Sequence, residues 1–240
     1  MFMSVLGAHQ LESFNHDGFV RVHRAFPRGV ALRCQELLWE QLEERRDDPS
    51  TWTRPVVRIG SQTHPVFTEA ATSPRWVEAI HEVAGPEASP TPWMGGSFAI
   101  RFPVEGDSGD DGWHIDGSYL GPDGSWWVNH RSDERALLML VLLSDVGVDD
   151  APTRIRIGSH RDIPDALVAY GDQGVSQRDF DLPPATRDRP IALATGEAGD
   201  AYLCHPFLVH AAQRNISGAP RFLAQPGVPW KGSSPGLPRS

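Results

Sequence analysis

The spacing of apolar positions changes about a third of the way along the chain. In the first part, residues 30–46 and 74–83 carry apolar side chains at helical spacing among charged ones, which predicts two amphipathic helices. Gly85 and Pro86 would end the second helix. From Trp93 onward the apolar residues form short or alternating runs, at residues 97–102, 135–143, 153–157, 191–194 and 200–209. The pattern therefore predicts an all-β sandwich or barrel that follows a mainly helical part.

Two long polar connections interrupt the predicted strands, at residues 103–112 and 170–190. Loops of this length in a compact domain often cover a binding site, so we regard 170–190 as a candidate lid. We expect one domain over residues 1–240, with a mostly helical part at 1–92, a β core at 93–230 and a loose tail at 231–240.

Composition narrows the classes of partner. The chain has 240 residues, of which 40% are hydrophobic and 22% charged, as in a soluble globular protein. Its formal net charge of −9 opposes binding to nucleic acid or to an anionic membrane surface. We find no signal-peptide pattern and no apolar run long enough to span a membrane. Cys34 and Cys204 lack the spacing of a zinc or redox motif, so a reducing cytoplasm is the expected location.

The strongest chemical signal is the segment Trp113-His114-Ile115-Asp116-Gly117. Side chains alternate along a strand, so His114 and Asp116 would point to one face and Ile115 to the other, toward a core. A non-haem iron(II) oxygenase needs two imidazoles and one carboxylate on one side of the metal, with the other positions open. Because His-x-Asp alone often arises by chance, a distant second histidine has to complete the set.

Two candidates for that histidine, His205 and His210, lie in the late apolar run. They are five positions apart and would face opposite ways on a regular strand. If residues 214–221 form a hairpin with an even number of loop residues, antiparallel pairing puts Arg221 on the same face as His210. A guanidinium there would suit the far carboxylate of 2-oxoglutarate, which it can bind through two hydrogen bonds. On the residues alone, both positions could equally be ordinary strand residues.

Several motifs occur in the order typical of the phytanoyl-CoA dioxygenase family of 2-oxoglutarate oxygenases, and the chain resembles that family over most of its length. Residues 14–20 are similar to the family's opening F-x-x-D-G-F, and His114-Ile115-Asp116 follows. Gly158-Ser159-His160 resembles the family's P-G-S-H turn, with Ile157 where proline is usual. The closing motif, H-x4-N-x-S-x3-R, is matched by His210, Asn215, Ser217 and Arg221.

The resemblance implies a mainly β fold, a double-stranded β-helix of the cupin-like jelly-roll type with N-terminal packing helices. It implies an iron(II) ion held by His114, Asp116 and His210, with 2-oxoglutarate as cosubstrate and O2 as oxidant. Arg221 would then bind the distal carboxylate of 2-oxoglutarate.

One position departs from the family pattern. Family members often carry a hydroxyl residue two positions after the distal histidine, where this chain has Ala212. Arg221 would therefore bind the cosubstrate without the support of that hydroxyl group, and Arg58 is a further candidate for binding it. The family pattern makes His160 a turn residue rather than a ligand.

Such an enzyme would be an Fe(II)/2-oxoglutarate-dependent dioxygenase that releases succinate and CO2 and hydroxylates an unactivated C–H bond. Halogenating relatives replace the carboxylate ligand with a small residue, so Asp116 argues against halogenation. Desaturation, epoxidation and ring closure stay open.

The substrate is expected to be a small molecule, of natural-product or amino-acid-like type, since no basic patch suits a coenzyme A thioester. Candidate substrate-binding residues are Trp126, Trp127 and Asn129, with Trp93 and Met94 as further wall, although these side chains could equally only pack the fold. The sequence gives no indication of oligomeric state.

Two other hypotheses keep the fold. One is a cupin-like isomerase or hydrolase with a non-redox metal at the same three ligands. This hypothesis gives Arg221 no ligand to bind. The other is a non-catalytic binding module on an oxygenase fold, which a missing ligand would favour; none is missing.

Overall fold

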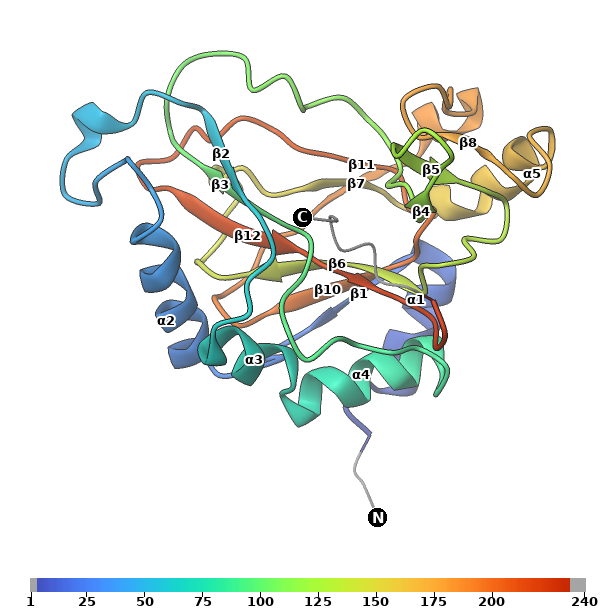
Figure 1. Cartoon of the computed structure of the whole chain (residues 1–240), viewed down its shortest axis with the longest axis horizontal. Coiled ribbons are helices and arrows are strands. Elements are labelled where there is room, and N and C mark those ends of the chain that lie inside the picture. Colours follow the sequence, from blue (N-terminus) through green and yellow to red (C-terminus); the bar gives the residue numbers. More distant parts are fainter. Residues whose placement is uncertain (1–3, 234–240) are drawn as a thin grey trace.

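A computed structural model describes residues 4–233, and one large antiparallel sheet runs through the middle of it (Figure 1). Its strands are β1 (Phe19–Val22), β2 (Val56–Ile59), β3 (Ser97–Arg101), β6 (Leu137–Leu142), β10 (Ala201–Cys204), β12 (Arg221–Gln225) and β13 (Gly227–Val228). The order across the sheet is β1-β10-β6-β12-β3-β2, and β13 pairs with β6 beyond the end of β12.

Two smaller sheets complete the β part. One has the order β11-β7-β9 and the other β4-β5-β8. Their strands are β4 (Tyr119–Leu120), β5 (Trp126–Val128), β7 (Arg154–Arg156), β8 (Val175–Ser176), β9 (Ile191–Leu193) and β11 (His210–Ala211). A buried cluster joins Leu140 and Leu223 of the large sheet to Ile155 of β7, so these two sheets enclose a core between them. This is the jelly-roll arrangement, and the predicted fold class is confirmed.

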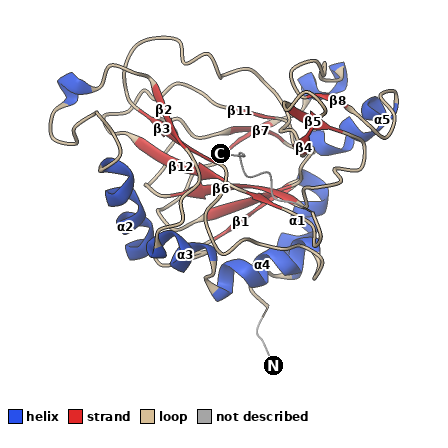
Figure 2. Cartoon of the chain, viewed as in Figure 1, coloured by secondary structure: helices blue, strands red, loops and turns tan. Residues whose placement is uncertain are grey.

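Helices cover the other face of the large sheet, as Figure 2 shows by its colours. They are α1 (Ala8–Asp17), α2 (Arg28–Trp39), α3 (Pro65–Ala71) and α4 (Pro74–Ala84), while α5 (Ile163–Val168) lies near the β4-β5-β8 sheet. Phe222 and Ala224 of β12 pack toward α2 to α4, whereas Leu223 packs between the sheets. Because side chains alternate along a strand, Arg221 faces the space between the sheets.

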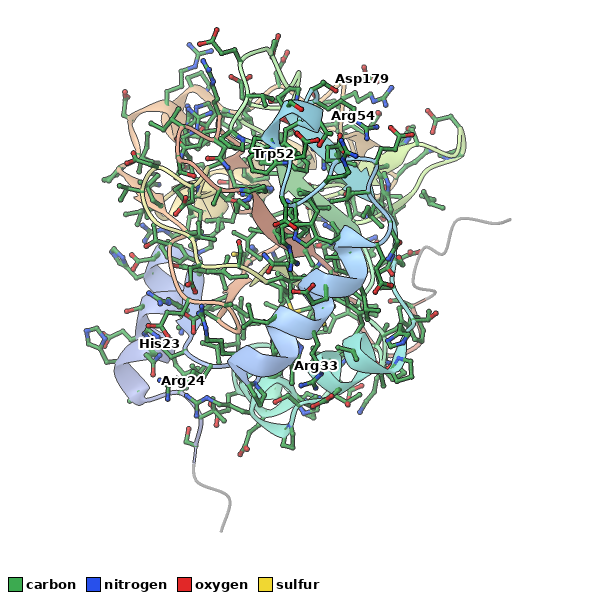
Figure 3. The ribbon with its side chains drawn as sticks, turned by 90° about the vertical axis from the view of Figure 1, so that its left-hand side faces the viewer. His23, Arg24, Arg33, Trp52, Arg54 and Asp179 are labelled. Carbon is green, nitrogen blue, oxygen red and sulfur yellow. The ribbon has the colours of Figure 1, made fainter. Side chains whose placement is uncertain are left out.

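The helix predicted at 74–83 is confirmed as α4, which ends at Gly85 with φ +81°, a conformation that glycine adopts without strain. The helix predicted at 30–46 is shorter, because α2 ends at Trp39. Beyond it the chain turns inward and buries Glu44, whose carboxylate accepts a 2.8 Å hydrogen bond from Arg54. Figure 3 shows α2 on the outside of the molecule, with Arg33 at its surface.

Other expected elements differ in extent. The helical part at 1–92 also supplies both edge strands of the large sheet, β1 and β2. Of the strand expected at 200–209, only Ala201–Cys204 forms, since Pro206 has no N–H to donate to a ladder. Lys231 donates its backbone N–H to Glu87, and the rest of the expected tail lies largely outside the described residues. Among residues 4–233, no helix is long and apolar enough to cross a membrane.

Candidate active site

His114, Asp116 and His210 meet at one end of the space between the sheets. One potential ligand atom from each lies within 4.8 Å of the others. Oδ1 of Asp116 is 3.7 Å from Nε2 of His114 and 3.9 Å from Nε2 of His210. An ion bound at about 2.0–2.2 Å from each donor fits among atoms at these separations. Two imidazoles and one carboxylate form the set that non-haem iron(II) sites use.

The backbone brings the two histidines together. His114 and His210 form an isolated antiparallel bridge, with N–H···O distances of 3.0 and 2.9 Å in the two directions. The expectation of a regular strand at 113–117 is wrong, because only His114 pairs and the chain then leaves the ladder. The expected alternation holds nonetheless, since Ile115 is buried in a separate apolar cluster beneath the site.

Each imidazole is held in the orientation that a metal ligand needs. Nδ1 of His114 donates to the carbonyl of Gly112 at 2.8 Å, and Nδ1 of His210 donates to the carbonyl of Leu208 at 2.9 Å. Both Nε2 atoms therefore carry lone pairs directed at Asp116. Nε2 of His210 is buried and has no hydrogen-bond partner among the described residues. A cation at the centre of the three residues would satisfy it, so the donor set fits iron(II).

Charge in the site favours metal binding at neutral pH. Burial, with the neighbouring His114, lowers the pKa of His210 to about 4, so the imidazole is neutral and able to coordinate. Burial alone would raise the pKa of Asp116, but His210, Arg135 and His114 outweigh it and lower that pKa below its ordinary value. Nη1 of Arg135 lies 3.3 Å from Oδ2 of Asp116, which leaves Oδ1 toward the histidines.

A group of arginines lies between the sheets, on β2, β3 and β12. Arg221 and Arg101 are cross-strand neighbours, and each is only 2% exposed. The carboxylate of Asp110 forms ion pairs with Arg101 and Arg58. Arg221 donates to the carbonyl of Ala151 at 2.6 Å, and its Nε has no partner among the residues described. Burial first, and then the neighbouring Arg101, lowers the pKa of Arg221 to about 9.

The hairpin at 214–221 that would place Arg221 beside His210 does not form. β11 pairs with β7, whereas β12 pairs with β3 and β6, so the intervening segment crosses from the small sheet to the large one. Arg221 faces the interior that His210 also borders, but from the opposite sheet. Two guanidinium groups thus pair with the carboxylate of Asp110, and Arg221 lies beside one of them, an excess of positive charge that favours binding of a further anion.

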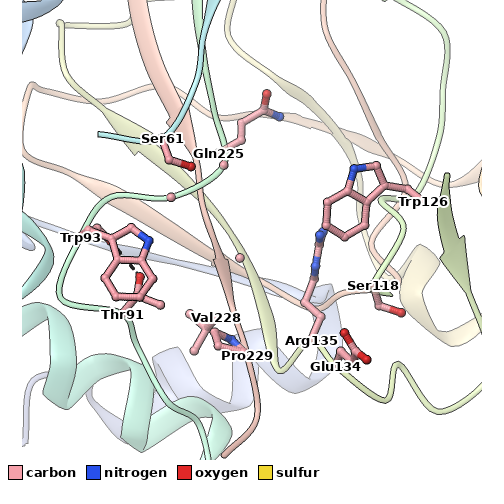
Figure 4. Close-up of a pocket in the computed structure, with 13 residues that line it drawn as sticks. Ser61, Thr91, Trp93, Ser118, Trp126, Glu134, Arg135, Gln225, Val228 and Pro229 are labelled. Carbon is pink, nitrogen blue, oxygen red and sulfur yellow. Dashed lines mark hydrogen bonds between the residues drawn. The ribbon is translucent and has the colours of Figure 1, made fainter. Parts of the chain in front are cut away.

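The space next to the three candidate metal ligands is hollowed. A depression of about 950 Å³ is bordered by His114, Asp110 and Arg58, and one of about 730 Å³ by Asp116, Arg58 and Arg135. The second continues into a smaller hollow of about 130 Å³, shown in Figure 4 and called the side hollow below. Its lining includes Trp93, Ser118, Trp126, Glu134, Arg135 and Gln225.

The candidate substrate residues separate into two groups. Trp126 lines all three hollows, and the guanidinium of Arg135 lies 5.6 Å from its ring centre. Trp127 instead packs against Gly121 and donates to Asp123, and Asn129 is buried and donates to Asp133 and to the carbonyl of Asp172. Of the further candidates, Trp93 lines the side hollow while Met94 belongs to the core under the helices.

Neither of the other conspicuous histidines reaches the metal site. The rings of His160 and His205 lie 4.9 Å apart, and His205 also packs on Phe14. Burial lowers the pKa of His205 to about 4. Its Nδ1 accepts a hydrogen bond from the backbone of Phe207 at 3.1 Å. The pair therefore belongs to packing around α1.

The long connection at 170–190 lies over the site. The side chain of Gln177, just after β8, accepts a 3.1 Å hydrogen bond from the backbone N–H of Gly117. Phe180 and Leu182 border the hollow that contains His114. A lid function stays a prediction, supported by this placement.

Sequence reasoning missed Arg135, Arg101, Asp110, Ser118 and Glu134. Arg135 was assigned only to the start of a predicted strand, and nothing local to it indicates a contact with a residue nineteen positions earlier. Asp110 lies in a polar loop, where one carboxylate among several carries no distinguishing pattern.

The chain is similar in fold to several solved structures. Among solved structures, the chain is similar to the epimerase SnoN in complex with Fe3+, alpha ketoglutarate and nogalamycin RO, with TM-score 0.66 and 19% identity over 95% of this chain and 86% of that chain. It is also similar to HygX from Streptomyces hygroscopicus with nickel, 2-oxoglutarate and hygromycin B, with TM-score 0.62 and 18% identity over 96% and 90% of the two chains. A third similar structure is the carbocyclase SnoK from nogalamycin biosynthesis, with TM-score 0.63 and 16% identity over 98% and 94%.

None of the curated proteins compared with the chain matches its sequence. The family model for phytanoyl-CoA dioxygenase (PhyH) matches residues 14–223, which is most of the chain. The protein therefore belongs to the phytanoyl-CoA dioxygenase (PhyH) family and is an enzyme that depends on iron(II), 2-oxoglutarate and O2.

Proposed function

We propose that His114, Asp116 and His210 hold the iron(II) ion, and that Arg221, with Arg101 beside it, binds the distal carboxylate of 2-oxoglutarate. The convergence of the three donor groups carries this assignment, above all the buried Nε2 of His210 that lacks a partner among the described residues. The arginine group supports the second part, because its positive charge exceeds the single carboxylate of Asp110.

The reaction we propose is hydroxylation of an unactivated C–H bond, with release of succinate and CO2. Iron(II), 2-oxoglutarate and O2 together supply the oxidising power. The protein holds the ligands in place and positions the target bond. Asp116 stands at the position where halogenating relatives have a small residue in place of the carboxylate ligand, and its presence favours hydroxylation over halogenation. SnoN is described as an epimerase and SnoK as a carbocyclase, so epimerisation and ring closure are the competing outcomes on this fold.

We propose a small polar molecule as substrate. The hollows beside Asp116 are lined by tryptophan and by hydroxyl, amide and charged side chains, which suits a compact ligand with several polar groups. SnoN is described with nogalamycin RO and HygX with hygromycin B, which are small molecules of natural-product type. Trp126 would form the wall against which the substrate packs.

The residues of the chain have separate tasks in this scheme. Gly112 and Leu208 fix the orientation of the two imidazoles through their carbonyl groups. Arg135 holds one oxygen of Asp116 and leaves the other for the metal. Gln177 ties the segment after Asp116 to the 170–190 connection, which would exclude water when substrate is bound.

An anaerobic titration tests the proposal. Apo-protein is titrated with iron(II) and then with 2-oxoglutarate, while the weak visible charge-transfer band of the chelate is followed. We expect the band in the wild-type protein and its loss in His210→Ala. A non-redox metal enzyme, the strongest alternative, would bind the metal without giving the band and would leave the buried arginines without a ligand.

A further inference from the structure

The side hollow contains an acidic group that the proposed chemistry does not use. Glu134 is half-buried in its lining, and within residues 4–233 its carboxylate forms no ion pair or hydrogen bond. Figure 4 shows it on the same side of the view as Arg135 and Ser118, with Trp93 and Thr91 across the hollow. A carboxylate that is partly removed from water without a partner costs free energy, which a cationic ligand would recover.

A second unpartnered polar group lines the same hollow. Ser118 is only 5% exposed, and its Oγ has no hydrogen-bond partner among the described residues. Its backbone is fixed, because the N–H of Ser118 donates to the carbonyl of Trp127 at 2.7 Å. Buried hydroxyl groups are nearly always hydrogen-bonded in folded proteins, so a polar ligand atom in the hollow would complete the hydrogen bonding of this one.

The nearest cation does not neutralise Glu134. The guanidinium of Arg135 is directed at Oδ2 of Asp116 and at the ring of Trp126. Asp133, the acidic neighbour on the other side, pairs with Arg131. Burial, with the charge of Asp133, raises the pKa of Glu134 above its ordinary value, as expected for a carboxylate without a compensating charge.

We infer that Glu134 and Ser118 form a subsite for a protonated amine of the substrate. An ammonium group donates up to three hydrogen bonds, so it can satisfy the carboxylate and the hydroxyl oxygen together. The inference rests on the proposed function and adds a substrate class to it, namely a small polar molecule that carries a basic amine.

The subsite would set the direction of the substrate. Arg135 follows Glu134 in sequence and reaches Asp116, so the side hollow and the metal-binding residues lie on either side of one arginine. A molecule whose amine sits at Glu134 can extend past Trp126 toward Asp116, since both border the adjoining hollow. Glu134 is therefore a specificity-determining residue.

Matched pairs of small probes test the inference. The pairs are glucosamine with glucose and cyclohexylamine with cyclohexanol, each offered to protein loaded with diamagnetic Zn(II) and saturated with 2-oxoglutarate. Binding is measured by ligand-observed NMR titration at neutral pH. We expect at least one amine to bind the wild-type protein on the order of tenfold more tightly than its hydroxyl counterpart, and Glu134→Gln to remove that preference.

The control variant is Glu43→Gln, which removes the same charge at an exposed position that pairs with Arg54 and lies outside the lining of the side hollow. It should keep the amine preference, and Glu134→Asp should keep part of it. The inference is overturned if no amine is preferred over its counterpart, or if Glu134→Gln retains the preference.

Failure of the inference is distinguishable from failure of the proposed function. The iron(II) and 2-oxoglutarate titration on Glu134→Gln should give the wild-type absorption band, because Glu134 touches neither the metal-binding residues nor the arginine group. A normal band without amine preference rejects only the amine subsite. An absent band in the wild-type protein rejects the proposed function itself.

Discussion

Arg135 and Asp116 are joined by a contact of 3.3 Å between Nη1 and Oδ2, while the other carboxylate oxygen faces both histidines. At the proposed metal site, the arginine would thus leave Oδ1 of Asp116 free to bind the metal. Its own charge is partly buried, so the contact weakens little with salt. A residue that orients a metal ligand in this way governs affinity without touching the ion.

Replacing Arg135 should therefore weaken metal binding. We expect Arg135→Met to lower the affinity for Fe(II) or Ni(II) by about 10- to 100-fold, as is usual when the partner of a metal ligand is removed. Arg135→Lys, which retains the charge, should recover part of the loss. Isothermal titration under anaerobic conditions measures both. Equal affinities in the wild-type protein and Arg135→Met would show that Asp116 needs no such support.

Replacing Arg221 should act on the cosubstrate rather than on the metal. Truncating one member of a buried charge pair costs about 2–5 kcal/mol, so we expect Arg221→Ala to raise the Kd of 2-oxoglutarate at least about 30-fold. Metal affinity should stay close to that of the wild-type protein. Titration of the absorption band with 2-oxoglutarate gives the Kd, and Arg221→Lys is the conservative control. An unchanged Kd would assign the distal carboxylate to another residue.

Asp110 provides a test of charge balance within the arginine group. Asp110→Asn removes the carboxylate that pairs with the buried Arg101, which should destabilise the apo-protein by about 1–3 kcal/mol. Bound 2-oxoglutarate returns negative charge to the same place, so saturating cosubstrate should stabilise this variant more than the wild-type protein. Thermal unfolding with and without 2-oxoglutarate measures the difference. Equal ligand-induced shifts would place the cosubstrate away from Asp110.

His205 should make the stability of the apo-protein depend on pH. Burial, with the neighbouring His160, lowers its pKa to about 4, against about 6.5 in an unfolded chain. Between these values the unfolded state binds the proton and the folded state does not, so stability is present above pH 6.5 and is lost as the pH falls toward 4. The loss reaches at most about 1.4 kcal/mol per pH unit.

Urea unfolding between pH 4 and pH 7 measures this slope. His205→Gln removes one titrating group and should reduce the slope by up to about 1.4 kcal/mol per pH unit, while His210, whose pKa is also lowered to about 4, continues to contribute. The variant is also expected to be less stable at pH 7. His9→Gln, at an exposed position, is the matched control and should keep the wild-type slope. A slope as steep in His205→Gln as in the wild-type protein would contradict the prediction.

Local patterns were sufficient for several features of the molecule. The spacing of Pro74 to Val83 predicted α4, because the apolar face of a helix and its terminating glycine are both encoded within a dozen residues. The two-residue separation of His114 and Asp116 put both side chains on one side of the chain even though no regular strand forms there.

Other features depended on which strands pair with one another in each sheet. A hairpin after His210 would have put Arg221 on the same sheet, yet β11 and β12 belong to different sheets, and Arg221 reaches the interior from the opposite side. No periodicity in the sequence relates the segments that meet around the site. These segments are joined by the contact of Arg135 with Asp116 and by that of Asp110 with Arg101. Ser118 and Glu134 likewise line one hollow from separate segments.

The sequence by itself thus determined the residue types of the proposed metal site, the mainly β fold and the family resemblance. The tertiary structure decided which charges surround those residues and which polar groups stay without partners. The physical reason is that side-chain alternation is a local property of the backbone, whereas a contact between distant segments depends on how whole sheets pack.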